Sequence, residues 1–237
     1  MSARPALPRA IAAEALGSAL LLAVVVGSGV MGEQLAAGNT AVALLANAIA
    51  TGCGLVVLIV IFAPLSGAHF NPAVTAVFCV RGELPWSQLA AYLPAQLSGA
   101  ALGVVAAHGM FGLPLIEASQ HARTGGAQWL GEFIATFGLI VTILGSLATR
   151  PAWTPLLVAA YITAAYWFTS STSFANPTVT IARSLTDTFA GIAPADVTGF
   201  IAAQLLGAAA GAVAGRWLWP ADGAAWRLPC TLKGSSP

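Results

Sequence analysis

Two long stretches of this chain contain no acidic or basic side chain, and they constrain its fold more than any other feature. One stretch covers residues 40–80 and is 41 residues long, and the other covers residues 151–182 and is 32 residues long. About 20 apolar residues are enough to cross a bilayer. Each stretch is therefore too long for one span and too apolar for a loop in water, which predicts an integral membrane protein.

Composition supports this prediction across the whole chain. Of the 237 residues, 58% are hydrophobic and 7% are Asp, Glu, Lys or Arg, whereas about a quarter of the residues in an ordinary soluble domain are charged. A soluble enzyme and a disordered scaffold are excluded on these grounds, and the net charge of +1 indicates no polybasic surface for nucleic acid. The widely separated Cys53, Cys79 and Cys230 indicate neither a disulfide framework nor a metal site. No cofactor is expected.

The positions of the charges predict six membrane-spanning helices, over residues 11–31, 40–63, 86–110, 128–149, 152–171 and 197–218. The first run is too long for the apolar core of a cleaved signal peptide, and it contains Glu14. In this arrangement Arg123 falls on one side of the membrane and most basic residues on the other: Arg4, Arg9, Arg81, Arg150, Arg216, Arg227 and Lys233. Because basic loops favour the cytoplasm, both termini are predicted to be cytoplasmic in an inner (cell) membrane protein.

Each charge-free stretch contains a break rich in Gly, Pro, Ser and Asn. The breaks read PLSGAHFNPAVT over residues 64–75 and TSSTSFANPTVT over residues 169–180, and each is followed by a short apolar tail. Irregular backbone at membrane depth is tolerated only where it is packed in protein or lines an aqueous cavity. We expect two re-entrant segments, each consisting of a loop followed by a half-helix.

The chain also repeats itself. Three pairs of similar segments occur in the same order in the two halves: residues 13–22 and 131–140, 71–75 and 176–180, and 95–103 and 203–211. Each half would contain three spans, so the second copy enters the membrane from the opposite face. The prediction is one domain over residues 1–237, built of inverted repeats at about 8–110 and about 127–220.

The Asn-Pro pair in each break has a direct physical interpretation. Asn is a strong helix N-cap, and Pro is favoured at the first helical position, so Asn71 and Asn176 should each begin a half-helix. Inverted repeats would bring the two N-termini together at mid-membrane, each with a partial charge of about +0.5. Such a point repels cations, while the side-chain amides can donate hydrogen bonds to a neutral solute.

These segments strongly resemble the aquaporin and aquaglyceroporin (major intrinsic protein) family, and SGAHFNPAVT is highly specific to it. The resemblance extends over nearly the whole chain. It implies six helices and two half-helices in an hourglass, one pore in each protomer of a homotetramer, and passive flow of water or small neutral solutes across the bilayer. The family's two Asn-Pro-Ala motifs correspond to Asn71, Pro72 and Ala73 and to Asn176, Pro177 and Thr178, of which Thr178 departs from the family's Ala.

Several polar residues within the apolar runs have more than one interpretation. Glu14 and Glu132 are costly at membrane depth, and the resemblance implies that they anchor the re-entrant loops, with a proton relay as the alternative. His69 either lines the pore, as in the family, or bonds a neighbouring carbonyl. Gln96 and Gln204 lie among small residues and are interpreted as interhelical contacts, with solute contacts as the alternative.

The resemblance also locates a selectivity filter. Counting from the two motifs, the family's four filter positions fall on Thr51, Ala164, Ser173 and Val179, none of which is aromatic, His or Arg. Val179 stands where the family has an Arg. The filter is therefore expected to be wide and uncharged, and similar to that of bacterial members without the Arg that are associated with arsenic handling.

Such a filter suits bulky neutral solutes, so arsenite as the neutral trihydroxide, glycerol-like polyols and water are the expected cargo. Methylated arsenicals, urea and peroxide remain open. Arg183 lies one helical turn beyond Val179. It either restores positive charge to the pore, or it snorkels or pairs in the outer vestibule, with Asp187 one further turn along.

Two other classes of protein have to be considered. An energy-coupled secondary transporter would share inverted repeats and broken helices, but it would usually have a carboxylate at the break, and neither break contains Asp or Glu. An intramembrane serine protease could use Ser66 with His69, or the GSG sequence at 27–29. That reading leaves the repeated Asn-Pro pair unexplained.

Overall fold

The computed structural model describes residues 6–220. Cys230, Arg4, Arg227 and Lys233 lie outside the described residues. The described chain forms eight α-helices and two short 3₁₀ segments: α1 (Leu7–Leu35), α2 (Thr40–Ser66), α3 (Pro72–Val80), α4 (Trp86–Phe111), α5 (Gly126–Thr149), η1 (Pro151–Trp153), α6 (Thr154–Phe168), α7 (Pro177–Arg183), η2 (Pro194–Asp196) and α8 (Val197–Leu218).

Six of these helices form the membrane-spanning bundle. Within the described residues, α1, α2, α4, α5 and α8 are each long and apolar enough to cross a bilayer unaided. Helix α6 has only 15 residues, but the three residues of η1 lead directly into it. Together they rise about 28 Å, which nearly matches the roughly 30 Å hydrocarbon core. The fifth span, predicted to end at residue 171, ends at Phe168, and the next three residues belong to the following loop.

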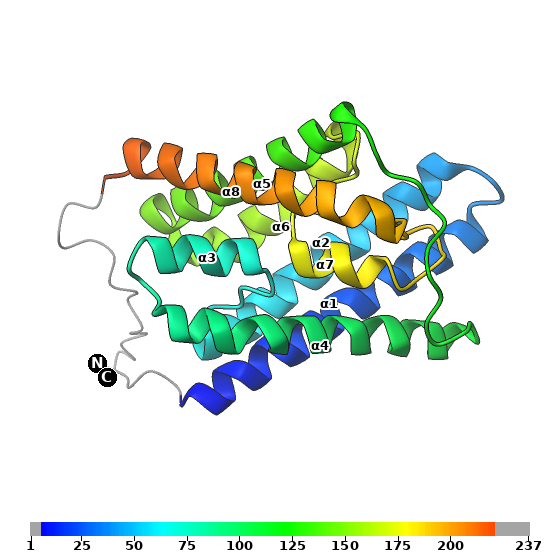
Figure 1. Ribbon diagram of the computed structural model, residues 1–237, viewed down its shortest axis with the longest axis horizontal. Coiled ribbons are helices and arrows are strands. Elements are labelled where there is room, and N and C mark those ends of the chain that lie inside the picture. The colour runs from blue at the N-terminus through cyan, green and yellow to red at the C-terminus, as the bar shows by residue number, and fades with distance from the viewer. Residues whose placement is uncertain (1–5, 221–237) are drawn as a thin grey trace, which may run out of the picture.

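The two predicted half-helices are α3, with 9 residues, and α7, with 7. Figure 1 shows them end to end between α4 and α8, with their N-termini adjacent at the centre of the bundle. Helix α3 runs from this point toward one end of the molecule, and α7 runs toward the other. The architecture is thus an all-α membrane fold of six spanning helices and two re-entrant half-helices arranged as inverted repeats.

Equivalent helices of the two halves pack in the same way, α1 against α4 and α5 against α8. A Cβ atom added to Gly99 would lie 2.0 Å from the carbonyl oxygen of Ala15, and one added to Gly207 would lie 2.3 Å from that of Phe133. Only glycine permits such close approach of the two backbones, as is common between membrane helices. This packing explains why the glycines recur in both halves, each three residues after a glutamine.

Candidate functional site

Asn71 and Asn176 are the N-caps of α3 and α7, and a proline follows each of them. The Oδ1 atom of Asn71 accepts a hydrogen bond from the backbone N–H of Ala73 at 2.9 Å. Oδ1 of Asn176 accepts from the backbone N–H groups of Thr178 at 3.0 Å and Val179 at 3.3 Å. The side-chain oxygens thus satisfy N–H groups that a helix start leaves without intrahelical partners.

The amide nitrogens of the same two asparagines connect the two halves. Nδ2 of Asn71 donates to the carbonyl of Ala175 at 2.8 Å, and Nδ2 of Asn176 donates to that of Phe70 at 2.7 Å. Both side chains line the central cavity. Each amide group has a second N–H, for which residues 6–220 provide no acceptor. These two N–H groups are therefore able to donate to a solute in the cavity.

The loops before the two half-helices share an unusual backbone conformation. Ala68 and Phe70 have φ values of 52° and 47°, and Ser173 and Ala175 have values of 53° and 48°. These residues stand three and one positions before Asn71 or Asn176. The left-handed conformation costs roughly 1–2 kcal/mol for each non-glycine residue, so other interactions must hold the loops in place.

Glu14 provides these interactions in the first half. Its fully buried carboxylate accepts hydrogen bonds from the backbone N–H groups of His69 at 2.9 Å and Phe70 at 2.7 Å. It also accepts from the Ser66 hydroxyl at 2.6 Å and from Nε2 of Gln96 at 2.7 Å. Four donors on one carboxylate compensate the high cost of burying its charge.

Glu132 occupies the equivalent position in the second half. It accepts from the backbone N–H groups of Phe174 at 2.8 Å and Ala175 at 2.9 Å, and from Nε2 of Gln204 at 2.6 Å. The same Gln204 nitrogen also donates to the Thr180 hydroxyl on α7 at 2.7 Å.

Gln96 makes the corresponding pair of contacts in the first half, since its Nε2 atom also lies 3.3 Å from the Thr75 hydroxyl on α3. Neither Gln96 nor Gln204 lines the cavity. Both glutamines therefore join a spanning helix to a half-helix, as the interhelical interpretation predicted.

His69 lines the cavity and is half-buried. Its Nδ1 atom lies 3.1 Å from the hydroxyl of Thr75, and its ring stacks on Phe78 with the ring centroids 4.8 Å apart. The partner of the imidazole is thus a hydroxyl and not the neighbouring carbonyl that the structural alternative assumed. The hydroxyl of Ser66 donates to Glu14 and accepts from the backbone N–H of Ala68, and no hydrogen bond joins it to His69 within residues 6–220.

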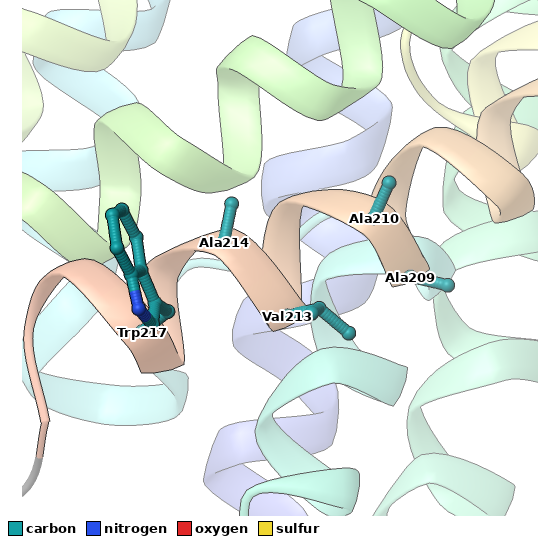
Figure 2. Close-up of a pocket in the computed structure, with 5 residues that line it drawn as sticks. All are labelled: Ala209, Ala210, Val213, Ala214 and Trp217. Atoms are coloured by element: carbon teal, nitrogen blue, oxygen red, sulfur yellow. The ribbon is translucent and has the colours of Figure 1, made fainter.

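The central cavity has a volume of about 790 Å³. Its lining begins near Leu7 and Pro151, passes Asn71 and Asn176, and includes the far end of α7 at Arg183. Figure 2 shows a separate, apolar hollow on the surface of α8, which contains none of the predicted site residues; it is lined by Ala209, Ala210, Val213, Ala214 and Trp217.

Three of the four predicted filter residues, Thr51, Ser173 and Val179, line the cavity and are buried. The placement of Ala164 is wrong, because its side chain is exposed on the outside of α6. Tyr166 lines the cavity instead, and its hydroxyl lies 3.3 Å from that of Thr51. Side chains two residues apart on a helix point about 200° apart. Ala164 and Tyr166 therefore lie on opposite sides of α6, one on the outside and the other toward the cavity.

Tyr166 belongs to a row of residues that forms the inner face of α6. Val158, Ile162 and Tyr166 recur every four residues, are all buried, and all line the cavity. Side chains four apart lie on one face of a helix, so this row marks the inner face. The part of the cavity that Thr51 lines therefore includes one aromatic side chain, which the sequence-based prediction did not include.

Arg183 is 2% exposed and also lines the cavity. Its Nε–H donates to the carbonyl of Ala190, and its guanidinium carbon lies 3.4 Å from the centre of the Phe174 ring. Asp187 does not pair with it; the Asp187 carboxylate accepts from the backbone N–H of Gln120 at 2.8 Å. Of the two alternatives for Arg183, its position in the structure agrees with the one in the pore. We call the part of the cavity lined by Thr51, Tyr166, Ser173, Val179 and Arg183 the filter end.

The remaining motif residues lie outside the cavity lining. Ala73 and Thr178 are completely buried, and Pro72 and Pro177 occupy the first positions of α3 and α7. The hydroxyl of Thr178 has no hydrogen-bond partner among the described residues. The departure from the family's Ala at this position therefore changes packing around α7 and not the surface of the cavity.

Comparison with known proteins agrees with this geometry. The family model described as "Major intrinsic protein" matches residues 1–167. Aquaglyceroporin AqpS of Rhizobium meliloti (strain 1021) is 55% identical over 212 residues, which cover 90% of this chain and 91% of that protein. The probable aquaporin NIP7-1 of Arabidopsis thaliana is 33% identical over 144 residues, which cover 60% of this chain and 51% of that protein.

A solved structure is also similar. The aquaglyceroporin of Plasmodium falciparum superposes with a TM-score of 0.68 at 19% sequence identity, covering 90% of this chain and 96% of that one. At that identity the likeness shows the shared fold. Together with the sequence matches and the paired Asn-capped half-helices, it shows that the chain belongs to the major intrinsic protein family of membrane channels.

Proposed function

We propose that this protein is a passive channel for small uncharged solutes, in particular glycerol-like polyols and arsenite as the neutral trihydroxide, and that it also conducts water. The observation that supports this proposal most strongly is the pair of half-helix N-termini at Asn71 and Asn176 on one continuous cavity. Two helix starts that face one point repel cations electrostatically. Their free amide N–H groups can replace part of the hydration of a neutral hydroxylated solute.

The filter end favours solutes that combine hydroxyl groups with apolar surface. Thr51, Tyr166 and Ser173 contribute hydroxyls, whereas Val179 contributes an apolar wall. The hydroxyl of Ser173 is buried without a partner among residues 6–220. An unsatisfied buried hydroxyl costs about 1–3 kcal/mol, and a passing solute with its own hydroxyls can relieve that cost.

The names of the relatives indicate the same class of solute. AqpS is described as an aquaglyceroporin. The glycerol uptake facilitator protein of Streptococcus pneumoniae (strain ATCC BAA-255 / R6) is 36% identical over 110 residues, which cover 40% of this chain and 47% of that protein. By extension, glycerol is the first solute to test, and arsenite follows from the small side chains at Thr51, Ser173 and Val179.

We further infer that Glu14 and Glu132 act as loop anchors, that the protein assembles as a homotetramer, and that it lies in the inner membrane with cytoplasmic termini. Four of the basic residues on which the predicted orientation rests lie within residues 6–220: Arg9, Arg81, Arg150 and Arg216. They lie at the start of α1, between α3 and α4, after α5 and near the end of α8, and these helix ends share one end of the bundle. Arg123 lies in the loop between α4 and α5, at the opposite end.

Stopped-flow measurements on proteoliposomes would test the proposal. The purified protein should accelerate the flux of glycerol, arsenite and water above that of empty liposomes, in proportion to the concentration gradient. Flux that saturates steeply and follows an imposed proton gradient would favour the secondary transporter. No acceleration for any of these solutes would refute the proposed function.

A further inference from the structure

Arg183 combines three features that no other described basic residue combines: it is buried, it lines the cavity, and one of its nitrogens has no hydrogen-bond partner. Nε donates to the carbonyl of Ala190, while Nη1 is the unpartnered atom. A buried guanidinium normally has its donors satisfied. Nη1 is thus a buried donor, on a side chain that lines the cavity, that the described residues leave unused.

The position of Arg183 on α7 lets its side chain reach the turn that Val179 occupies. The two residues are four apart, so they lie on the same face of the helix, about 6 Å apart along the axis. Side chains on a helix lean toward its N-terminus. The guanidinium accordingly stacks on Phe174, a residue that precedes Asn176 by two. The positive charge of Arg183 is therefore held over Phe174, in the loop that precedes α7.

Arg123 lies near the same aromatic ring but is bound differently. Its guanidinium carbon is 5.2 Å from the centre of the Phe174 ring. Its nitrogens donate to several backbone carbonyls and one hydroxyl in the surrounding loops: Gly191 at 2.7 Å, Ser171 at 3.4 Å, Phe189 at 3.5 Å and the Thr172 hydroxyl at 3.5 Å. Arg123 does not line the cavity. It stabilises the loops, whereas Arg183 keeps a free donor at the filter end.

We propose that Arg183 is a specificity-determining residue of this channel, which excludes cations at the filter end and donates a hydrogen bond to neutral solutes there. This inference rests on the proposed function. The positive charge at the filter end is then supplied by Arg183, one turn after Val179 on α7. The small apolar side chain of Val179 leaves the pore wider than an Arg at 179 would, but the pore still carries a charge. A purely structural role for Arg183, as a brace for the Ala190 carbonyl, would make no difference to which solutes pass.

The test compares a cation and a neutral solute in the same liposomes. Uptake of labelled guanidinium ion is measured beside glycerol flux for the wild type, Arg183→Gln, Arg183→Met and Arg183→Lys. Gln retains an N–H donor for the Ala190 carbonyl without the charge, and Lys retains the charge. Arg216→Met is the matched control, because Arg216 is exposed near the opposite end of the bundle and its loss changes the net charge equally.

Removing a desolvated charge from the path of a cation should raise the ratio of guanidinium uptake to glycerol flux by about tenfold or more. We expect this rise in Arg183→Gln and Arg183→Met, and ratios close to that of the wild type in Arg183→Lys and Arg216→Met. An unchanged ratio in a folded neutral variant would overturn the inference and leave the proposed function intact. Failure of both neutral variants to fold would likewise overturn it in favour of a structural brace. Absence of glycerol flux in the wild type would instead refute the proposed function.

Discussion

Replacing Glu14 with Ala removes the acceptor that holds the first re-entrant loop. Four donors contact this carboxylate: the backbone N–H groups of His69 and Phe70, the Ser66 hydroxyl and the Gln96 amide. The hydroxyl and the amide can turn to other partners, but the two backbone N–H groups are fixed by the loop. Each buried donor left unsatisfied costs about 1–3 kcal/mol. The expected loss in the free energy of unfolding is therefore about 2–6 kcal/mol for the two backbone groups.

A loss of this size is measurable as a shift of the thermal midpoint in detergent. For a chain of 150–250 residues, 1 kcal/mol corresponds to about 2–4 °C, so Glu14→Ala should lower the midpoint by roughly 5–20 °C. Glycerol flux per inserted protein should fall as well, because the loop positions Asn71. Glu14→Gln retains one oxygen acceptor but places an amide N–H opposite another donor, and we expect a loss between those of the wild type and Glu14→Ala.

Glu33→Ala is the matched control, because Glu33 is an exposed carboxylate on the same helix. It should leave both the midpoint and the flux unchanged. Glu132→Ala should resemble Glu14→Ala, since it leaves two backbone N–H groups of the second loop without an acceptor. If Glu14→Ala behaves like Glu33→Ala in both measurements, the carboxylate does not hold the loop and the reasoning is wrong.

Three further predictions concern the pore. Asn71→Asp places a negative charge between the two helix starts, so planar-bilayer recordings should detect cation current, or the protein should fail to insert, whereas the wild type should be electrically silent. Val179→Arg adds a second long cation beside Arg183 and should lower the ratio of arsenite to water flux in liposomes several-fold; an unchanged ratio would remove position 179 from the filter. Ala164→Leu should leave polyol fluxes unchanged, whereas Tyr166→Ala should raise the flux of four- and five-carbon polyols relative to glycerol. If the two variants have equal effects on these fluxes, the assignment of the lipid-facing and cavity-facing sides of α6 is wrong.

The repeated part of the site could be predicted from the sequence because each element occurs twice. One Asn-Pro pair is an ordinary turn, but the pairs at Asn71 and Asn176 stand at equivalent points of two similar halves. A buried Glu in a corresponding helix of each half adds a second constraint of the same kind. The structure shows both capped half-helices and both sets of loop contacts at these positions.

The α6 contribution to the filter could not be located by counting. The count back from Asn176 crosses the non-helical residues 169–175, where the rise per residue and the rotation differ from those of a helix. Periodicity within α6 gives little help, because lipid-facing and cavity-facing side chains are both apolar. Exposure of apolar side chains to lipid has no cost. The sequence therefore does not distinguish the lipid-facing side of α6, which carries Ala164, from the cavity-facing side, which carries Tyr166.

The position of Arg183 depends on a contact that the local sequence does not contain. A guanidinium at this depth requires acceptors, and the carbonyl of Ala190 supplies one only because the chain after α7 folds back over it. Without that contact, snorkelling toward the outer surface is the expected behaviour of a long basic side chain. The sequence of α7 alone is therefore compatible with both alternatives.

The contacts at the centre of the bundle make the filter end dependent on the first half of the chain. Glu14 fixes the N–H of Phe70, and the carbonyl of Phe70 accepts from the amide of Asn176. The side-chain oxygen of Asn176 in turn caps α7, the helix on which Val179 and Arg183 stand. A change at Glu14 is therefore expected to affect the position of α7, and with it the residues that we propose select the solute. The second half contacts Asn71 in the same way, since the carbonyl of Ala175 accepts from the amide of Asn71. We therefore expect each half-helix to depend on both re-entrant loops for its position.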